Sequence, residues 1–135
     1  MAGLACAELL VEQGHEVQLF DKGRSPGGRM SSRRMETPAG IAIFDHGAQY
    51  FTARDPDFAS AVNRWNAQGV VARGPDARND AWVGVPAMNA IPRQMARSLN
   101  VTSGAHVRGI ARGADGWHLA CGDGNAGPFD ALVIA

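Results

Sequence analysis

The chain has 135 residues, which is enough for one compact domain with a single core and too few for two full domains. Thirteen lysines and arginines balance thirteen aspartates and glutamates, so the net charge gives no reason to expect nucleic acid or an anionic membrane as a partner. The two cysteines lie far apart and no run of about 18 apolar residues occurs, which predicts a soluble protein of a reducing compartment, by default the cytoplasm. The four histidines show no metal-ligand spacing, and no metal site is expected.

The first elements read as part of a βαβ unit. Ala2–Gln13 spaces its apolar residues as a helix does, and Gly14 follows as its C-terminal cap. Glu16–Phe20 is a short run rich in Val, Leu and Phe, typical of a strand buried on both faces, and it ends at Asp21. Helix, tight turn, strand and acid form the second half of the unit. No apolar run precedes them, so the first strand is expected to be missing.

The middle of the chain predicts a hairpin and a helix. Gly23–Gly28 is a loop of Gly, Ser and Pro. Arg29–Met35 and Ile41–Asp45 predict two short strands joined by a tight turn. Pro56–Gln68 carries apolar residues three or four positions apart, with proline in the first turn, and predicts a helix.

The remaining residues predict short elements. Arg73–Asp80 is polar and turn-rich, typical of a linker or loop, whereas Trp82–Val85 predicts a brief strand and Ala87–Leu99 a helix. The last third predicts three strands, of which the final one is continuously apolar from Ala131 and resembles a central strand of a parallel sheet. These strands span His106–Arg112, Trp117–Cys121 and Phe129–Ala135, with turns at Ala114–Gly116 and Gly122–Gly127.

Two features suggest a dinucleotide. Glycines of a dinucleotide-binding βαβ unit let the backbone approach the pyrophosphate, and an acid at a strand end binds the ribose hydroxyls; Gly3 and Asp21 stand at those two places. A basic cluster without any acidic residue follows, at a density that suits a phosphate-bearing ligand, with a solvated loop as the alternative. The basic cluster comprises Lys22, Arg24, Arg29, Arg33 and Arg34.

Four motifs in order between positions 2 and 51 resemble the opening of the flavin amine oxidase family. They are Ala2-Gly3-Leu4-Ala5-Cys6-Ala7, Val17-Gln18-Leu19-Phe20-Asp21-Lys22, Gly27-Gly28-Arg29-Met30 and Asp45-His46-Gly47-Ala48-Gln49-Tyr50-Phe51. Because the fourth motif has the form Asp-x-Gly-Ala-Gln-Tyr, the chain is most similar in kind to the renalase-like branch. The resemblance implies FAD as the cofactor.

The resemblance also implies contacts with the adenosine half of FAD. Ala2 and Gly3 are expected beside the pyrophosphate. Asp21 is expected to bind the adenosine ribose, with Lys22 flanking the ribose or the adenine. A strand after the second helix supplies backbone hydrogen bonds to the adenine in this family, and Val107 stands at that place.

The third motif is expected at the diphosphate. There Gly27 and Gly28 let the loop close over the phosphates, and Arg29 contributes a fixed positive charge. An ordinary surface arginine is the alternative for Arg29.

The fourth motif is expected at the flavin end of the cofactor. Gly47 would approach the flavin through its missing side chain, together with Ala48, and Tyr50 by its ring. Tyr50 has a core aromatic residue as its alternative, and His46 is interpreted as a structural histidine rather than a flavin contact.

The predicted fold is α/β, a Rossmann-like FAD-binding domain without its first strand, followed by the start of a substrate-domain segment. Residues 1–51 and 98–135 are assigned to FAD binding and 52–97 to the substrate segment. The implied reaction is hydride transfer from a small-molecule substrate to the flavin, where the substrate is either an amine or a reduced nicotinamide-type compound. The sequence identifies no catalytic residue and indicates no oligomeric state. Two alternatives stay open, a truncated non-catalytic remnant of such an enzyme and an NAD-dependent dehydrogenase, against which Gly-Gly-Arg after the ribose acid argues.

Overall fold

The computed structural model describes residues 1–74, 80–122 and 124–135. Residues 75–79 of the predicted linker and residue 123 of the last predicted turn lie outside these ranges. The chain divides into two compact units, which we call unit 1 (Met1–Pro26 with Met95–Ala135) and unit 2 (Gly27–Gln94). The prediction that residues 1–51 and 98–135 bind FAD and that residues 52–97 begin a substrate segment concerns function. The division into two structural units does not test it, and it stays a prediction.

Unit 1 begins with helix α1 (Ala2–Glu12), whose buried face contains Leu4 and Ala7. Gly14 follows with φ 87°, the left-handed conformation that suits glycine after a helix end. The predicted helix and its cap are therefore confirmed.

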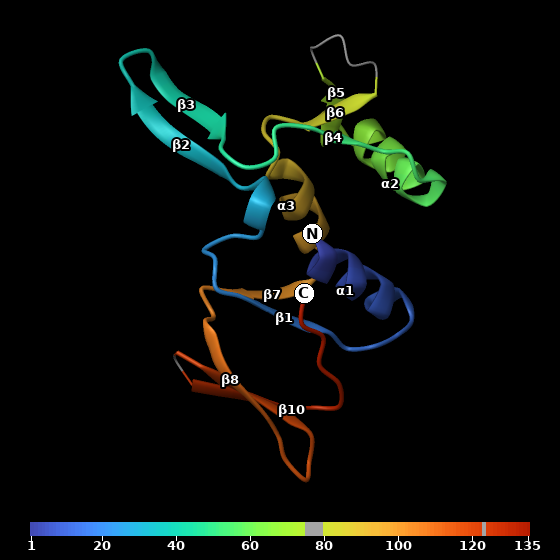
Figure 1. Cartoon of the computed structure of the whole chain (residues 1–135), viewed down its shortest axis with the longest axis vertical. Helices are drawn as coiled ribbons and strands as arrows, with labels where there is room; N and C mark the ends of the chain where they lie inside the picture. The colour runs from blue at the N-terminus through green and yellow to red at the C-terminus, as the bar shows by residue number, and fades with distance from the viewer. Residues whose placement is uncertain (75–79, 123) are drawn as a thin grey trace. The chain divides into compact units, whose positions relative to one another are not determined.

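Strand β1 (Gln18–Asp21) pairs in parallel with β7 (Asn100–Ser103), so that Asp21 lies opposite Ser103 (Figure 1). The sequence predicts β1 to within one or two residues. It does not predict β7, because a strand of four residues with a polar majority has no periodicity to reveal it.

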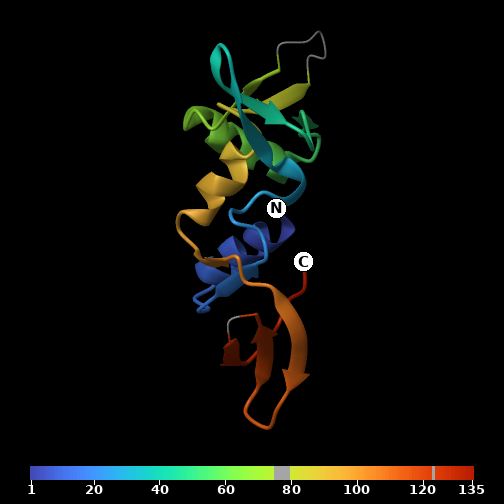
Figure 2. The same ribbon diagram turned by 90° about the vertical axis from the view of Figure 1, so that its left-hand side faces the viewer.

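The rest of unit 1 is an antiparallel sheet in the order β10-β9-β8, seen side by side in Figure 2. Strands β8 (Val107–Arg112) and β9 (Trp117–Cys121) confirm two predicted strands. The predicted strand Phe129–Ala135 is wrong, because β10 (Gly124–Phe129) ends where that strand was expected to begin. Apolar character indicates burial, but a strand forms only where a ladder partner is present. In the described chain, residues 131–135 pair with no strand.

Unit 2 opens with the one-turn 3₁₀ helix η1 (Gly28–Met30), followed by strands β2 (Ser32–Thr37) and β3 (Gly40–Asp45). The predicted hairpin is confirmed, with Thr37 opposite Gly40 across a two-residue loop. The predicted strand Arg29–Met35 begins three residues too early, because Arg29 and Met30 belong to η1 and Ser31 follows it before the strand. The amides of Met30 and Ser31 bond back to the Gly27 and Gly28 carbonyls, which tightens the chain before the strand begins.

The core of unit 2 lies around a second antiparallel sheet, in the order β4-β6-β5. Helix α2 packs on this sheet and begins at a cap where Asp55 accepts hydrogen bonds from the Asp57 and Phe58 amides. The predicted helix is confirmed. The elements are β4 (Phe51–Thr52), α2 (Pro56–Ala67), β5 (Val71–Arg73) and β6 (Ala81–Gly84).

Helix α3 (Ala90–Ala96) is shorter than the predicted Ala87–Leu99. Its N-terminal boundary has an identifiable cause. The amides of Met88 and Asn89 bond to side chains of the hairpin, and the two residues form a turn in front of the helix. These side-chain acceptors hold Met88 and Asn89 in the turn, and the helix begins after them.

Candidate functional site

The third and fourth motifs meet through their backbones. The Ala48 amide donates a hydrogen bond of 2.8 Å to the Arg29 carbonyl oxygen. A Cβ atom at Gly47 would overlap the same oxygen, so glycine is required there for the two segments to approach each other. The third motif, predicted at the diphosphate, and the fourth motif, predicted at the flavin end, are thus neighbours in unit 2. The approach of Gly47 and Ala48 to the flavin itself stays a prediction.

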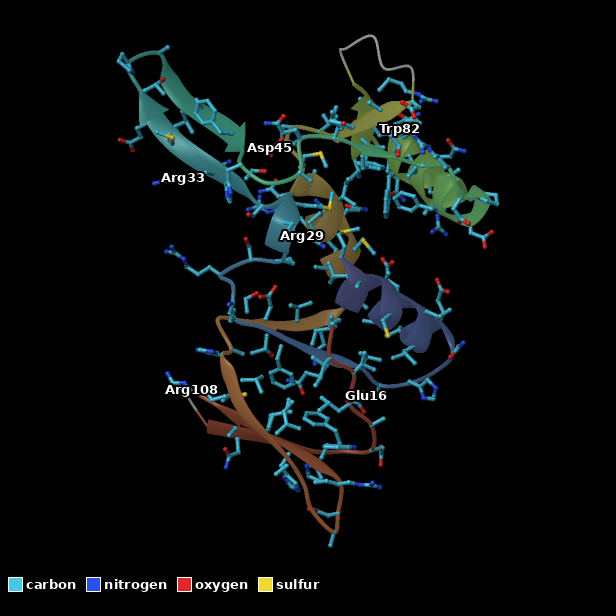
Figure 3. The ribbon with its side chains drawn as sticks, in the orientation of Figure 1. Glu16, Arg29, Arg33, Asp45, Trp82 and Arg108 are labelled. Atoms are coloured by element: carbon cyan, nitrogen blue, oxygen red, sulfur yellow. The ribbon has the colours of Figure 1, made fainter. Side chains whose placement is uncertain are left out.

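Asp45 joins the same region to the turn before α3 (Figure 3). Its two carboxylate oxygens accept hydrogen bonds from the buried Met88 amide at 3.1 and 3.2 Å, and it also accepts one from the Ser32 hydroxyl at 2.5 Å. The Asn89 amide lies 3.4 Å from the Ser32 hydroxyl oxygen. One carboxylate therefore satisfies donors from two distant segments. Motif position alone pointed to Asp45, and nothing in the sequence indicated Ser32 or Met88 as its partners.

Two other residues of the fourth motif have defined surroundings. The ring Nε2 of His46 lies 3.2 Å from the Ser31 hydroxyl oxygen, which fits the structural interpretation of this histidine. Tyr50 is 44% exposed, which argues against its alternative as a core aromatic residue. Contact of its ring with a flavin remains a prediction.

The basic cluster has exposed side chains throughout, but it is not a single surface. Arg33 and Arg34 are adjacent in strand β2, and their side chains therefore point to opposite faces of the hairpin. Arg29 precedes them in η1, where its side chain is exposed. None of the five members makes an ion pair within the described ranges of the chain. The charges are thus available to a ligand. They do not form the single basic surface that their density in the sequence suggests.

Asp21 lies at the carboxyl end of the parallel strand pair, the edge at which α/β sheets bind ligands. Its Oδ1 accepts the Gly23 amide at 2.8 Å, and its backbone carbonyl accepts the Ala105 amide at 3.0 Å. These bonds fix the loop after β1, where Lys22 is exposed. In the part of the chain that the structure describes, the other oxygen of Asp21 has no hydrogen-bond donor, and its contact with a ribose hydroxyl stays a prediction.

The remaining predicted contacts also lie in unit 1. A methyl group at Gly3 would meet only the Ala135 Cβ at 3.5 Å, so packing within the described chain does not require glycine there. Ala2 is exposed at the start of α1. Val107 is the first residue of β8, opposite Cys121. Gly3 in the first turn of α1, the second carboxylate oxygen of Asp21 and the exposed cation of Lys22 are features consistent with a dinucleotide as ligand.

Comparison with protein families gives two matches that divide the chain between them. The NAD(P)-binding Rossmann-like domain matches residues 1–65, and the flavin containing amine oxidoreductase matches residues 70–135. The predicted α/β, Rossmann-like fold class is confirmed, and so is FAD as the cofactor. Together the matches support a place for the chain in the superfamily of FAD-dependent amine oxidoreductases.

No helix in the described residues is long and apolar enough to cross a membrane. The same ranges contain no group of three or more His, Cys, Asp or Glu side chains arranged to hold a metal ion.

Proposed function

Because the family matches support an FAD-dependent amine oxidoreductase, we propose that the chain functions as an oxidoreductase of the renalase-like type. Bound FAD supplies the hydride-accepting chemistry, and the protein binds and orients the cofactor and its substrate. The observation that carries this proposal is the backbone contact of Arg29 with Gly47 and Ala48, because it unites the two motifs that resemble the family most.

The residues would hold the cofactor by different means. Asp21 would accept a hydrogen bond from the adenosine ribose through its unoccupied carboxylate oxygen, with Lys22 beside it. Arg29 would place its guanidinium against the diphosphate, a pairing that is stronger than one between neutral groups. Its backbone is already held by Ala48, so the side chain binds phosphate without having to order the loop.

Two substrate classes remain in the proposal, a small amine and a reduced nicotinamide-type compound. Both deliver a hydride, and they differ in what the enzyme has to recognise. An amine presents a single cationic nitrogen, whereas the nicotinamide compound presents a planar ring with an amide.

The cofactor claim is tested with the visible spectrum of the purified chain after incubation with FAD and desalting. We expect a flavin spectrum in the wild-type chain and FAD affinity at least about tenfold lower in Arg29→Ala, the loss that follows from one charge-assisted contact. Arg64→Ala, on the exposed side of α2, is the matched control and should bind FAD normally. A colourless wild-type protein would remove the cofactor claim for this chain.

The reaction is tested by anaerobic mixing of the flavin-loaded chain with each substrate class, followed by loss of the visible flavin absorbance. Bleaching by one class identifies the substrate type. A chain that holds FAD but is bleached by neither contradicts the oxidoreductase proposal and supports the non-catalytic alternative. Stabilisation by NAD(P) and not by FAD would favour the dehydrogenase, which the name of the first matching family also suggests.

A further inference from the structure

The hairpin of β2 and β3 exposes large apolar side chains on both of its faces. Residues opposite each other in an antiparallel ladder share a face, so Met35 and Phe44 lie on one face and Ile41 and Ile43 on the other. These four residues are between 40% and 68% exposed. A hairpin of two strands gains little stability by itself, whereas further strands stabilise it. The exposed apolar residues therefore indicate a surface that can bind another strand.

Strand β2 has a free edge. Its sheet contains only β2 and β3, so one long side of β2 has no ladder partner (Figure 1). In the part of the chain that the structure describes, residues 33–36 make no hydrogen bond outside the ladder with β3. Such an edge presents unpaired backbone N–H and C=O groups, to which a further strand can bind.

The charges of β2 limit which strand fits this edge. Arg34 and Glu36 are two positions apart and lie on the same face of the strand, whereas Arg33 lies on the other face. Arg34 and Glu36 are exposed, and neither forms an ion pair within the described ranges. A complementary strand has an acidic residue opposite Arg34 and a basic residue opposite Glu36.

A second copy of β2 meets this requirement in one register. If the two copies run antiparallel about a two-fold axis at Met35, Arg34 of each chain lies opposite Glu36 of the other. An axis at position 33 or 34 instead places two arginines opposite each other, and an axis at position 36 places two glutamates so. Because like charges directly opposite each other are destabilising, the charges select the axis at Met35.

We propose that the chain forms a symmetric dimer through β2, in a four-stranded sheet of the order β3-β2-β2-β3. Two ion pairs between Arg34 and Glu36 lie on one face of this sheet, and Met35 packs against its own copy on the other. Strand β3 has no charged residue from Gly40 to Phe44, so its edge has no such selection of register. The dimer does not depend on FAD, and it holds or fails independently of the proposed oxidoreductase activity.

The dimer is tested by analytical ultracentrifugation of the full chain at increasing concentration. Because the paired strands are short, the interface is smaller than a standard one, and we expect a dissociation constant of about 10–100 µM. Arg34→Glu and Glu36→Arg each place like charges opposite each other and should weaken the dimer at least about tenfold. Arg33→Glu is the matched control on the other face and should not. A wild-type chain that stays monomeric at about 1 mM, or a dimer that tolerates both reversals, would overturn the proposal.

Mixing the two reversed chains tests the register. An equimolar mixture of Arg34→Glu and Glu36→Arg places opposite charges across both contacts, so a heterodimer should form with about the wild-type affinity. A folding defect in either variant would not be repaired by mixing. If both variants are folded and the mixture stays monomeric, the register is wrong.

A disulfide locates the axis of the dimer. Residues directly opposite each other in an antiparallel pair are close enough for a disulfide, so oxidised Met35→Cys should give a covalent dimer joined at position 35. Ile41→Cys, on the exposed face of β3, is the control and should stay monomeric. Peptide masses distinguish this bond from one through Cys6 or Cys121. A covalent dimer joined at position 41 and not at 35 would place the interface on β3 and contradict the proposal.

Discussion

The two compact units differ in how their apolar residues are used. Unit 2 has a continuous core, whereas in unit 1 the side chains of Val133 and Ile134 are 60% and 81% exposed, and its buried apolar residues include Leu4 and Leu119. The core of unit 2 comprises Val62, Trp65, Val70, Val71, Ala81, Trp82, Ala87, Met88 and Ile91. The two units should therefore respond differently to substitution.

The difference matters for the cofactor contacts that are proposed within each unit. The motif contact between Arg29 and Gly47 is part of a unit with its own core, so its geometry rests on packed side chains. Asp21 instead depends on a parallel pair of two short strands that are distant in sequence. Parallel sheets are usually buried on both faces, and a two-stranded pair gains little stability by itself. The diphosphate contact proposed in unit 2 should therefore be better ordered than the ribose contact proposed in unit 1.

The largest effect is expected from Gly47→Val. The new side chain would overlap the Arg29 carbonyl oxygen, force the two motifs apart and destabilise unit 2 by about 2–4 kcal/mol. Urea unfolding measures the change, and FAD affinity should fall with it. Gly122→Val is the control, since a Cβ there meets nothing within 4 Å. A stable Gly47→Val protein would show that the motifs tolerate separation.

Asp45→Ala should rank second, at about 2 kcal/mol. It leaves the buried Met88 amide and the Ser32 hydroxyl without their common acceptor. Hydrogen exchange should increase at residues 88–91 and not in β8 or β9, because the loss lies within unit 2. Asp130→Ala removes an exposed carboxylate and serves as the control. Equal exchange in Asp45→Ala and wild-type protein would show that water replaces the carboxylate.

Phe129→Ala tests unit 1. The rings of Phe20 and Phe129 meet edge to face at 6.0 Å, which connects β1 to β10. A double-mutant cycle with Phe20→Leu should give a coupling of about 1 kcal/mol, the usual value for aromatic pairs. The measurement is the unfolding free energy of the four proteins. Zero coupling would mean that β1 is held by its ladder with β7 alone.

The smallest effect is a dependence on pH in the turn between β8 and β9. The hydrogen bond from His118, 2.8 Å long, lowers the pKa of Asp115 below its ordinary value of 3.8. Because the pKa in the folded state is the lower one, the stabilisation is present above about pH 3.8 and is lost as the pH falls through the folded value. Asp115→Asn should lose this low-pH component, measured as the difference in melting temperature from wild-type protein between pH 5 and pH 3. An unchanged profile would contradict it.

The elements that sequence predicts well are those with local signals. Helix α1 ends at a left-handed glycine, α2 begins at an aspartate cap, and the β2–β3 hairpin has turn residues between its strands. The failures are non-local. Strand β10 contains Gly124 and Gly127, both with positive φ, so its residues resemble a turn, and its strand character comes from pairing with β9.

The candidate site divides in the same way. The motifs and their glycines could be recognised from residue order. The structure adds a physical reason for one of these glycines, because Gly47 lies against the Arg29 carbonyl oxygen. The partners of Asp45 could not be recognised, because a hydrogen bond to the Met88 amide depends on the fold and leaves no trace in the identity of that residue. Backbone donors are common to all residues except proline.

The contact between Arg29 and the fourth motif uses only backbone atoms of position 29. The backbone of Arg29 therefore holds the loop, and its side chain is the part proposed to contact the ligand. The side chain can be exchanged while the loop keeps its shape. Position 47 has no such freedom. For protein engineering, position 29 is thus a place to alter preference for the charge of a cofactor without redesigning the fold, and position 47 should be left as glycine.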